Sequence, residues 1–274
     1  MPFPALSRFV ETLPAQGTFS LWWGPLDGEA WFTHNEHTRH YAASTMKVGL
    51  VLAAYREADQ GTFDLDRPVT VHNDFVSAAG SGRYGIEHTD DSDPEPWRWL
   101  GTEVALRCLC QRALVRSSNL ATNLVLEQVG VEAVAEALAA VGACASVVTR
   151  GIEDSVAREA GYDNLVTAAD LALTLQALAS GQAASTASCR EIVAVLAAQQ
   201  INDALPAQLP PGIRVAHKSG WVNGISHDAG IVYPDGEDPF VFVMCTTSNL
   251  DEQAGCALIA AGAAAAYADR RVQP

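Results

Sequence analysis

The alternation of apolar and polar positions divides this chain into strand-like ends and a helical middle. Five short runs with strand character occupy 18–26, 30–33, 213–218, 228–233 and 240–246. Apolar residues recur at helical spacing in the remaining segments, which are 2–13, 44–59, 102–116, 119–129, 131–141, 167–179, 187–199 and 251–269. The segment 73–99 is rich in Gly, Ser, Asp and Pro, which predicts an irregular loop.

Strands at both ends and helices between them predict an α+β fold. The simplest assembly is one antiparallel sheet built from both chain termini and flanked by helices, with an all-helical domain inserted between them. This arrangement predicts a sheet domain from residues 1–43 and 206–274, and a helical domain from residues 44–205.

The composition is that of a globular chain with an acidic surface. Apolar residues make up 49% of the sequence and charged residues 18%, so there is ample material for a core. The formal net charge of −15 repels phosphate backbones, which argues against nucleic-acid binding. No apolar run is long enough to cross a bilayer, so we expect no membrane partner.

The first residues and the cysteines both favour a reducing compartment. The start, MPFPALSR, lacks the basic and apolar regions of a signal peptide, which predicts a cytoplasmic location unless a leader has been removed. The six cysteines show no framework spacing and are expected to be reduced thiols. His34, His37 and His40 lack the partners of a metal motif and are predicted to be surface histidines, so no metal or other cofactor is expected.

Candidate chemistry begins with lysine, because the chain contains only two lysines and both lie in short motifs. Lys47 closes an S-x-x-K motif that starts at Ser44, and residues three apart share a helix face. Serine is a weak nucleophile until a base takes its proton, and a lysine in a dry site beside another cation can be that base. The alternative is a helix-capping serine with a solvated lysine.

Two further motifs follow along the chain. Ser117-Ser118-Asn119 opens a helix, either as a simple cap or as a proton relay with an amide that holds a substrate carbonyl. Lys218-Ser219-Gly220 follows a strand-like run, where the lysine and serine can bind a carboxylate and the glycine allows a close approach of a substrate backbone. The alternative for this last motif is a strand that ends in a turn.

Taken together, the three motifs resemble the S-x-x-K, S-D-N and K-T-G set of the class A β-lactamases and penicillin-binding serine hydrolases. Ser117 lies 73 residues after Ser44, and Lys218 lies 101 residues after Ser117. A serine at 117 favours the class A-like branch over the branches with tyrosine there. The resemblance implies a β-lactamase/transpeptidase-like fold with the active site at the interface of the two domains.

The resemblance also implies a role for each matching residue. Ser44 attacks a carbonyl, Lys47 takes its proton, and Ser117 returns a proton to the leaving nitrogen. The residues implied to bind substrate are Asn119, Lys218, Ser219, Gly220 and Trp221. Of these, Trp221 supplies a backbone N–H which, with that of Ser44, forms the oxyanion hole.

One departure from the family concerns the step that releases the product. Class A β-lactamases carry a glutamate in an E-x-x-L-N loop, and no such motif occurs within residues 149–165. The nearby carboxylates are Glu153, Asp154 and Glu159, for each of which a solvated loop charge or a helix cap is the simpler interpretation. We therefore expect easy acylation by β-lactams but slow turnover.

The resulting hypothesis is a serine hydrolase that forms an acyl-enzyme on Ser44 and recognises β-lactams or related amides. The alternatives are a D-alanyl peptidase, a small-molecule esterase or amidase, and a non-catalytic binding module that retains the fold. In each case the partner is a small molecule. His217 lies beside Lys218 and either tunes that neighbour or, more simply, faces the other side of the strand. Tyr84 and Trp97 lie in the irregular segment, where each either stacks on a ligand or, more simply, packs within the loop.

Overall fold

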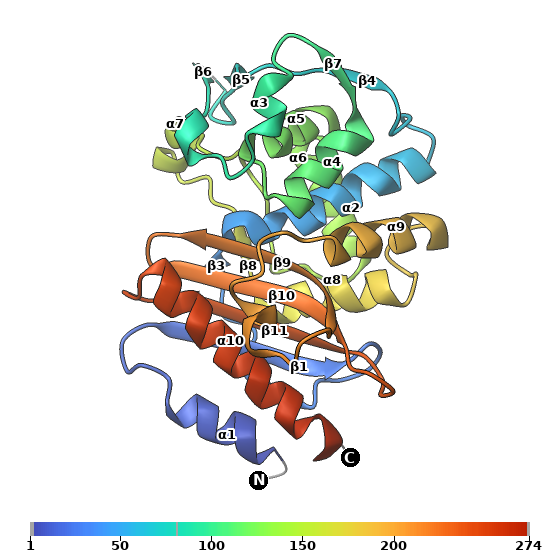
Figure 1. Ribbon diagram of the computed structural model, residues 1–274. Coiled ribbons are helices and arrows are strands. Elements are labelled where there is room, and N and C mark those ends of the chain that lie inside the picture. The colour runs from blue at the N-terminus through green and yellow to red at the C-terminus, as the bar shows by residue number, and fades with distance from the viewer. Residues whose placement is uncertain (1–2, 81, 273–274) are drawn as a thin grey trace.

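Both ends of the chain contribute to one antiparallel sheet in the computed structural model, which describes residues 3–80 and 82–272. The strand order is β2-β1-β11-β10-β9. The strands are β1 (Thr18–Pro25), β2 (Phe32–His34), β9 (Arg214–Val222), β10 (Ile225–Tyr233) and β11 (Phe240–Thr247). The predicted α+β fold, with a sheet made from both termini, is confirmed (Figure 1).

The two faces of the sheet belong to two different hydrophobic cores. Along β1, Leu21 and Trp23 join one core, whereas Trp22 between them joins the other, as the two-residue period of a strand requires. The first core is closed by α1 (Pro4–Glu11) and α10 (Glu252–Asp269), which lie together across one face (Figure 1). The second core continues into the helical region, so both faces are covered and the central strands are buried.

The helical region is built around α2 (Met46–Asp59), whose first ten residues are all buried. A helix that is buried on every side must be surrounded by other helices. These neighbours are α4 (Leu106–Val115), α5 (Asn119–Val129), α6 (Val131–Ala140) and α9 (Thr186–Ala197). α8 (Ala168–Ala179) packs on the inner face of the sheet.

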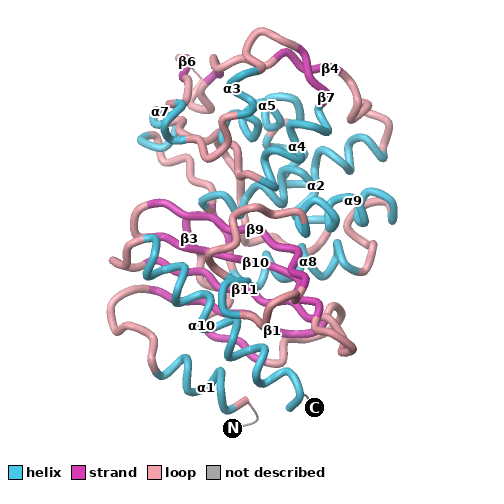
Figure 2. Tube along the Cα trace, in the orientation of Figure 1, coloured by secondary structure: helices cyan, strands magenta, loops and turns pink. Residues whose placement is uncertain are grey.

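Short elements complete the chain, as Figure 2 shows. The short helices are α3 (Glu95–Arg98) and α7 (Ser155–Glu159). Three two-stranded pairs join β3 (His40–Tyr41) to β8 (Leu165–Val166), β4 (Pro68–Thr70) to β7 (Glu103–Ala105), and β5 (Phe75–Val76) to β6 (Arg83–Tyr84).

Several predicted element boundaries were wrong, and two of these concern α4 and β9. The helix expected over 102–116 begins only at Leu106, because the residues before it pair with β4. The strand expected to end at Lys218 continues to Val222, so the whole Lys218-Ser219-Gly220 motif lies inside β9 and stays in register with β10. The motif is therefore held by a sheet ladder and not by a turn.

The cores do not separate at the predicted domain boundaries. One continuous core contains both the α2 helix and the inner face of the sheet, so the division at residues 43/44 and 205/206 stays a prediction. Within residues 3–80 and 82–272, no helix is both long and apolar enough to cross a bilayer.

Candidate active site

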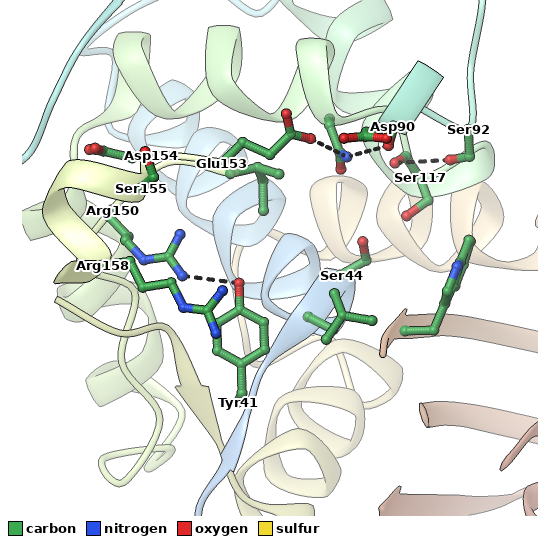
Figure 3. Close-up of a pocket in the computed structure, with 15 residues that line it drawn as sticks. Tyr41, Ser44, Asp90, Ser92, Ser117, Arg150, Glu153, Asp154, Ser155 and Arg158 are labelled. Carbon is green, nitrogen blue, oxygen red and sulfur yellow. Dashed lines mark hydrogen bonds between the residues drawn. The ribbon is translucent and has the colours of Figure 1, made fainter. Parts of the chain in front are cut away.

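A cavity of about 450 Å³ opens where the first turn of α2, the start of α5 and the end of β9 meet. Four predicted site residues line this cavity: Ser44, Ser117, Asn119 and Trp221 (Figure 3). Lys47 and Lys218 are fully buried beside them. The structure thus brings together motifs that are separated by up to 174 residues in the sequence.

Ser44 lies in a 3₁₀ turn, Ala43–Thr45, immediately before α2, and not on the α-helix that the sequence predicts from this residue. The preceding residue, Ala43, has a φ of +44°, a conformation that side chains other than glycine rarely adopt. Such strain is retained where the surrounding structure fixes it, and it is concentrated at functional sites. Here it fixes the position of Ser44 at the cavity wall.

Lys47 points toward Ser117 and Asn119. Its Nζ donates to the Ser117 carbonyl at 2.7 Å, to Asn119 Oδ1 at 2.9 Å and to Ser117 Oγ at 3.3 Å. The predicted contact with Ser44 is not present as a hydrogen bond between these two described residues. The 3₁₀ turn and the acceptors on the α5 side account for this difference.

The surroundings of Lys47 favour the neutral amine. Complete burial lowers the pKa of Lys47 well below its ordinary value, and the nearby charge of Lys218 lowers it further. Asp91 and Glu153 act in the opposite direction, but burial is the larger effect. The arrangement matches the predicted dry site beside a second cation.

Lys218 also contacts the Ser117 hydroxyl. Its Nζ donates to Ser117 Oγ at 3.0 Å and to the Ser219 carbonyl at 2.6 Å. Burial lowers the pKa of Lys218 to about 7, against the opposing charge of Asp228. Ser117 has a φ of +58°, so this strained residue holds its hydroxyl between two buried lysines.

The rest of the Lys218-Ser219-Gly220 motif has two distinct features. Ser219 Oγ is buried and has no hydrogen-bond partner among the described residues, which leaves it available to a ligand. A Cβ on Gly220 would lie 2.7 Å from Ser44 N and 2.9 Å from Thr45 N. The glycine therefore makes room for the backbone of the nucleophile turn, whereas the sequence suggested room for a substrate backbone.

A comparison with known protein families identifies the family of this chain. A sequence profile described as the Beta-lactamase enzyme family matches residues 5–269. The chain belongs to this family. The predicted resemblance is confirmed, and the protein is a β-lactamase-like serine hydrolase.

Solved structures of the β-lactamase family agree with this assignment. A β-lactamase from Sphaerobacter thermophilus is 29% identical, with a TM-score of 0.84 over 99% of this chain and 98% of that chain. A mutant of the class A β-lactamase of the last common ancestor of Gram-negative bacteria is 26% identical to this chain. Its TM-score is 0.82 over 99% of both chains. The penicillin-binding protein PBP-A shares the fold, at 19% identity and a TM-score of 0.80 over 98% and 96% of the two chains. No curated protein sequence matches this chain significantly.

Asp91 supports the start of α5, a role that the sequence analysis did not predict. Its carboxylate accepts from the backbone N–H of Asn119 at 3.0 Å, from that of Leu120 at 2.9 Å and from Ser118 Oγ at 3.1 Å. Trp97 Nε1 also donates to it at 3.0 Å, so Trp97 packs behind the site and does not line it. The sequence does show an acidic run from Asp90 to Asp93, which indicates a helix-capping or structural role. It does not indicate that Asp91 contacts the start of α5.

The loop that follows Arg150 places its three candidate carboxylates differently. Glu153 is half-buried at the cavity, where Oε2 accepts from Glu87 N at 3.1 Å and Oε1 from Asn119 Nδ2 at 3.4 Å. Burial raises the pKa of Glu153 above its ordinary value. Asp154 is buried and caps α7, and Glu159 is exposed, as the simpler interpretation of both predicted.

The remaining predictions concern histidines and cysteines. His40 is buried, not a surface residue, and bonds to Ser20 Oγ and Thr247 Oγ1 at 2.8 Å each; burial lowers its pKa to about 4. His217 turns to the face of β9 opposite Lys218 and pairs with Asp228 at 2.9 Å. Within the described residues, no group of three or more His, Cys, Asp or Glu side chains is placed to hold a metal, and all six cysteines are free.

Proposed function

We propose that this β-lactamase-like serine hydrolase acts through an acyl-enzyme on Ser44, recognises β-lactams or related amides, and releases the acyl group slowly. One observation carries the proposal: Ser117 Oγ lies within hydrogen-bond reach of two buried lysines, 3.3 Å from Lys47 Nζ and 3.0 Å from Lys218 Nζ. A purely structural hydroxyl does not require two desolvated amines, whereas a proton relay does.

Acylation uses the neutral form of Lys47. The amine takes the proton of Ser44 Oγ as that oxygen attacks the carbonyl carbon, and the carbonyl oxygen accepts from the N–H groups of Ser44 and Trp221. The proton then passes from Lys47 to Ser117 Oγ as the hydroxyl gives its own proton to the leaving nitrogen. Catalytic hydrogen bonds are often long or poorly aligned before substrate binds, so the lack of a Lys47–Ser44 hydrogen bond between these described residues is compatible with this role.

Substrate binding uses donors that are already in place. Lys218, while protonated, and the unpaired hydroxyl of Ser219 supply donors for a carboxylate on the leaving-group side. Asn119 Nδ2 donates to the Asp90 carbonyl at 3.0 Å and to Glu153 at 3.4 Å. The longer contact is the one that a substrate carbonyl would replace.

Deacylation is expected to be slow because the two loop carboxylates that line the cavity, those of Glu153 and Asp154, are both hydrogen-bonded to other groups. The two oxygens of Glu153 accept from Glu87 N and Asn119 Nδ2. Figure 3 shows this carboxylate directed toward the side of the cavity where Asp90 lies. A PBP-A mutant in an acyl-enzyme complex with penicillin G shares this fold at 19% identity.

The test is intact-mass spectrometry of the protein with benzylpenicillin over time. We expect a persistent adduct of one penicillin, located on Ser44 by peptide mapping and lost in Ser44→Ala. Absence of both the adduct and penicillin hydrolysis would refute an acyl-enzyme with β-lactams. An ester and D-alanyl peptide panel would then separate the esterase and peptidase alternatives from a binding module. Turnover well above about 10 s⁻¹ would refute slow deacylation.

A further inference from the structure

The cavity has a cationic wall on the side away from Ser117. Tyr41, Arg150 and Arg158 line this wall, and Figure 3 shows both arginines beside Tyr41, across the cavity from Ser92 and Ser117. The Cζ atoms of Arg150 and Arg158 lie 5.6 Å and 5.7 Å from the centre of the Tyr41 ring. The chain has 17 Lys and Arg residues against 32 Asp and Glu residues, so two arginines on one cavity wall give that wall a charge opposite to the net charge of the protein.

Arg150 is a fixed part of the wall. Its side chain is 2% exposed, and it donates to the Tyr162 carbonyl at 2.8 Å, the Gly151 carbonyl at 3.1 Å and Tyr41 Oη at 3.1 Å. Asp163 approaches it only to 3.9 Å. Arg150 therefore orders the wall and contributes charge, but most of its donors are already used.

Arg158 has its donors free. The residue is exposed at the cavity, and within residues 3–80 and 82–272 its guanidinium makes no ion pair and no side-chain hydrogen bond. It lies over the Tyr41 ring, a contact that holds a guanidinium without consuming its N–H groups. A planar guanidinium with free donors is the side chain best suited to grip a carboxylate.

The acidic residues of the same loop do not neutralise this arginine. Asp154 is fully buried and accepts from Ser77 Oγ and Ala78 N, both at 2.8 Å, and from Ala157 N at 3.0 Å. Glu153 is held at the Asn119 end of the cavity. Both carboxylates are thus satisfied by donors other than Arg158.

We propose that the Tyr41–Arg158 wall is a second anion subsite, which binds a carboxylate on the acyl side of the substrate. This inference rests on the proposed function, in which Ser117 and Lys218 define the leaving-group side, so the opposite wall faces the acyl substituent. The preferred substrate class is then an acyl amide or β-lactam with a carboxylate at each end. A cavity of about 450 Å³ accommodates such a molecule.

The test compares two penicillins that share the ring system and the phenyl group and differ by one side-chain carboxylate: α-carboxybenzylpenicillin and benzylpenicillin. The measured quantity is the ratio of their second-order acylation constants in wild type, Arg158→Gln, Arg158→Lys and Arg190→Gln. Arg190 is an exposed arginine on α9, and its loss changes the net charge equally. Figure 1 shows α9 on the opposite side of the helical region from α7, the helix that carries Arg158.

We expect Arg158→Gln to lower the ratio at least about fivefold, as the loss of an ion pair of ordinary strength requires. Arg158→Lys should recover part of it, and Arg190→Gln should keep the wild-type ratio. Salt at 0.5 M should reduce the wild-type ratio because it screens exposed charges. An Arg158→Gln ratio equal to that of wild type would overturn the subsite.

Failure of the subsite is distinguishable from failure of the proposed chemistry. Titration calorimetry of Ser44→Ala gives the dissociation constants of the two penicillins without any acyl transfer. Tighter binding of α-carboxybenzylpenicillin than of benzylpenicillin supports the subsite if this difference is lost when Arg158→Gln is added to Ser44→Ala. This result holds even if neither probe forms an adduct. Equal dissociation constants for the two probes overturn it.

Discussion

Lys47 Nζ lies 2.7 Å from the carbonyl oxygen of Ser117 and 3.3 Å from its hydroxyl. This contact joins the second residue of α2 to the residue two before α5, across 70 positions of sequence. In the proposed mechanism, this contact lets a neutral Lys47 exchange a proton with Ser117. The same hydroxyl is 3.0 Å from Lys218 Nζ, so the three motifs meet at one oxygen atom.

The clearance at Gly220 predicts a selective loss of activity in Gly220→Ala. The new Cβ would press on two backbone nitrogens that cannot yield as a side chain would, so β9 and the nucleophile turn must separate. A displacement of this kind costs about 100-fold in acylation rate. Gly49→Ala is the matched control in α2, because its Cβ meets only the flexible end of Leu138. Equal acylation rates in the two variants would show that the close approach is unimportant.

Asp91 is expected to support the start of α5. Asp91→Ala leaves the backbone N–H groups of Asp93, Asn119 and Leu120, the Ser118 hydroxyl and the Trp97 indole N–H without their carboxylate. This loss should lower the free energy of unfolding by about 2 kcal/mol. Asn119 should then be less well positioned, so acylation should also slow. Asp90→Ala removes an adjacent exposed carboxylate but keeps the backbone carbonyl that Asn119 uses. Denaturant unfolding of both variants measures the difference, and equal stabilities would contradict this role.

The pKa of Lys218 predicts how acylation depends on pH. Burial lowers this pKa to about 7, so the cation is present below pH 7 and is lost as the pH rises above it. A carboxylate-bearing substrate needs that cation, and its second-order acylation constant should fall by up to about tenfold per pH unit above 7. Lys218→Arg keeps the charge throughout, so its profile should stay level between pH 7 and 9. A level wild-type profile would show that Lys218 stays charged or does not bind substrate.

Glu153 provides a test of slow deacylation. Since its carboxylate is engaged by Glu87 N and Asn119 Nδ2, Glu153→Gln should change the lifetime of the Ser44 adduct by no more than about threefold, whereas loss of a true general base costs about 100-fold or more. Glu159→Gln makes the same charge change at an exposed position. An adduct that persists about 100-fold longer in Glu153→Gln alone would identify Glu153 as the base.

The residues that the sequence predicts well are those whose chemistry lies in short motifs. Lys47 and Lys218 stood out because lysine is otherwise absent, and the sheet followed from alternating runs at both chain ends. Asp91 and Arg158 were not predicted because their contacts are between segments far apart in sequence, and neither residue belongs to a motif. The positive φ values of Ala43 and Ser117 also leave no local signal, since tertiary packing imposes them.

The role of Lys47 is the central claim, and the acylation rate of Lys47→Arg tests it most directly. Arginine cannot act as a base, so we expect adduct formation with benzylpenicillin to fall at least about 1,000-fold. Lys47→Met, which is close in size and also lacks a base, should lose activity to the same extent, while circular dichroism verifies that both variants are folded. Acylation of folded Lys47→Arg within about tenfold of wild type would mean that another group activates Ser44 and would contradict the account.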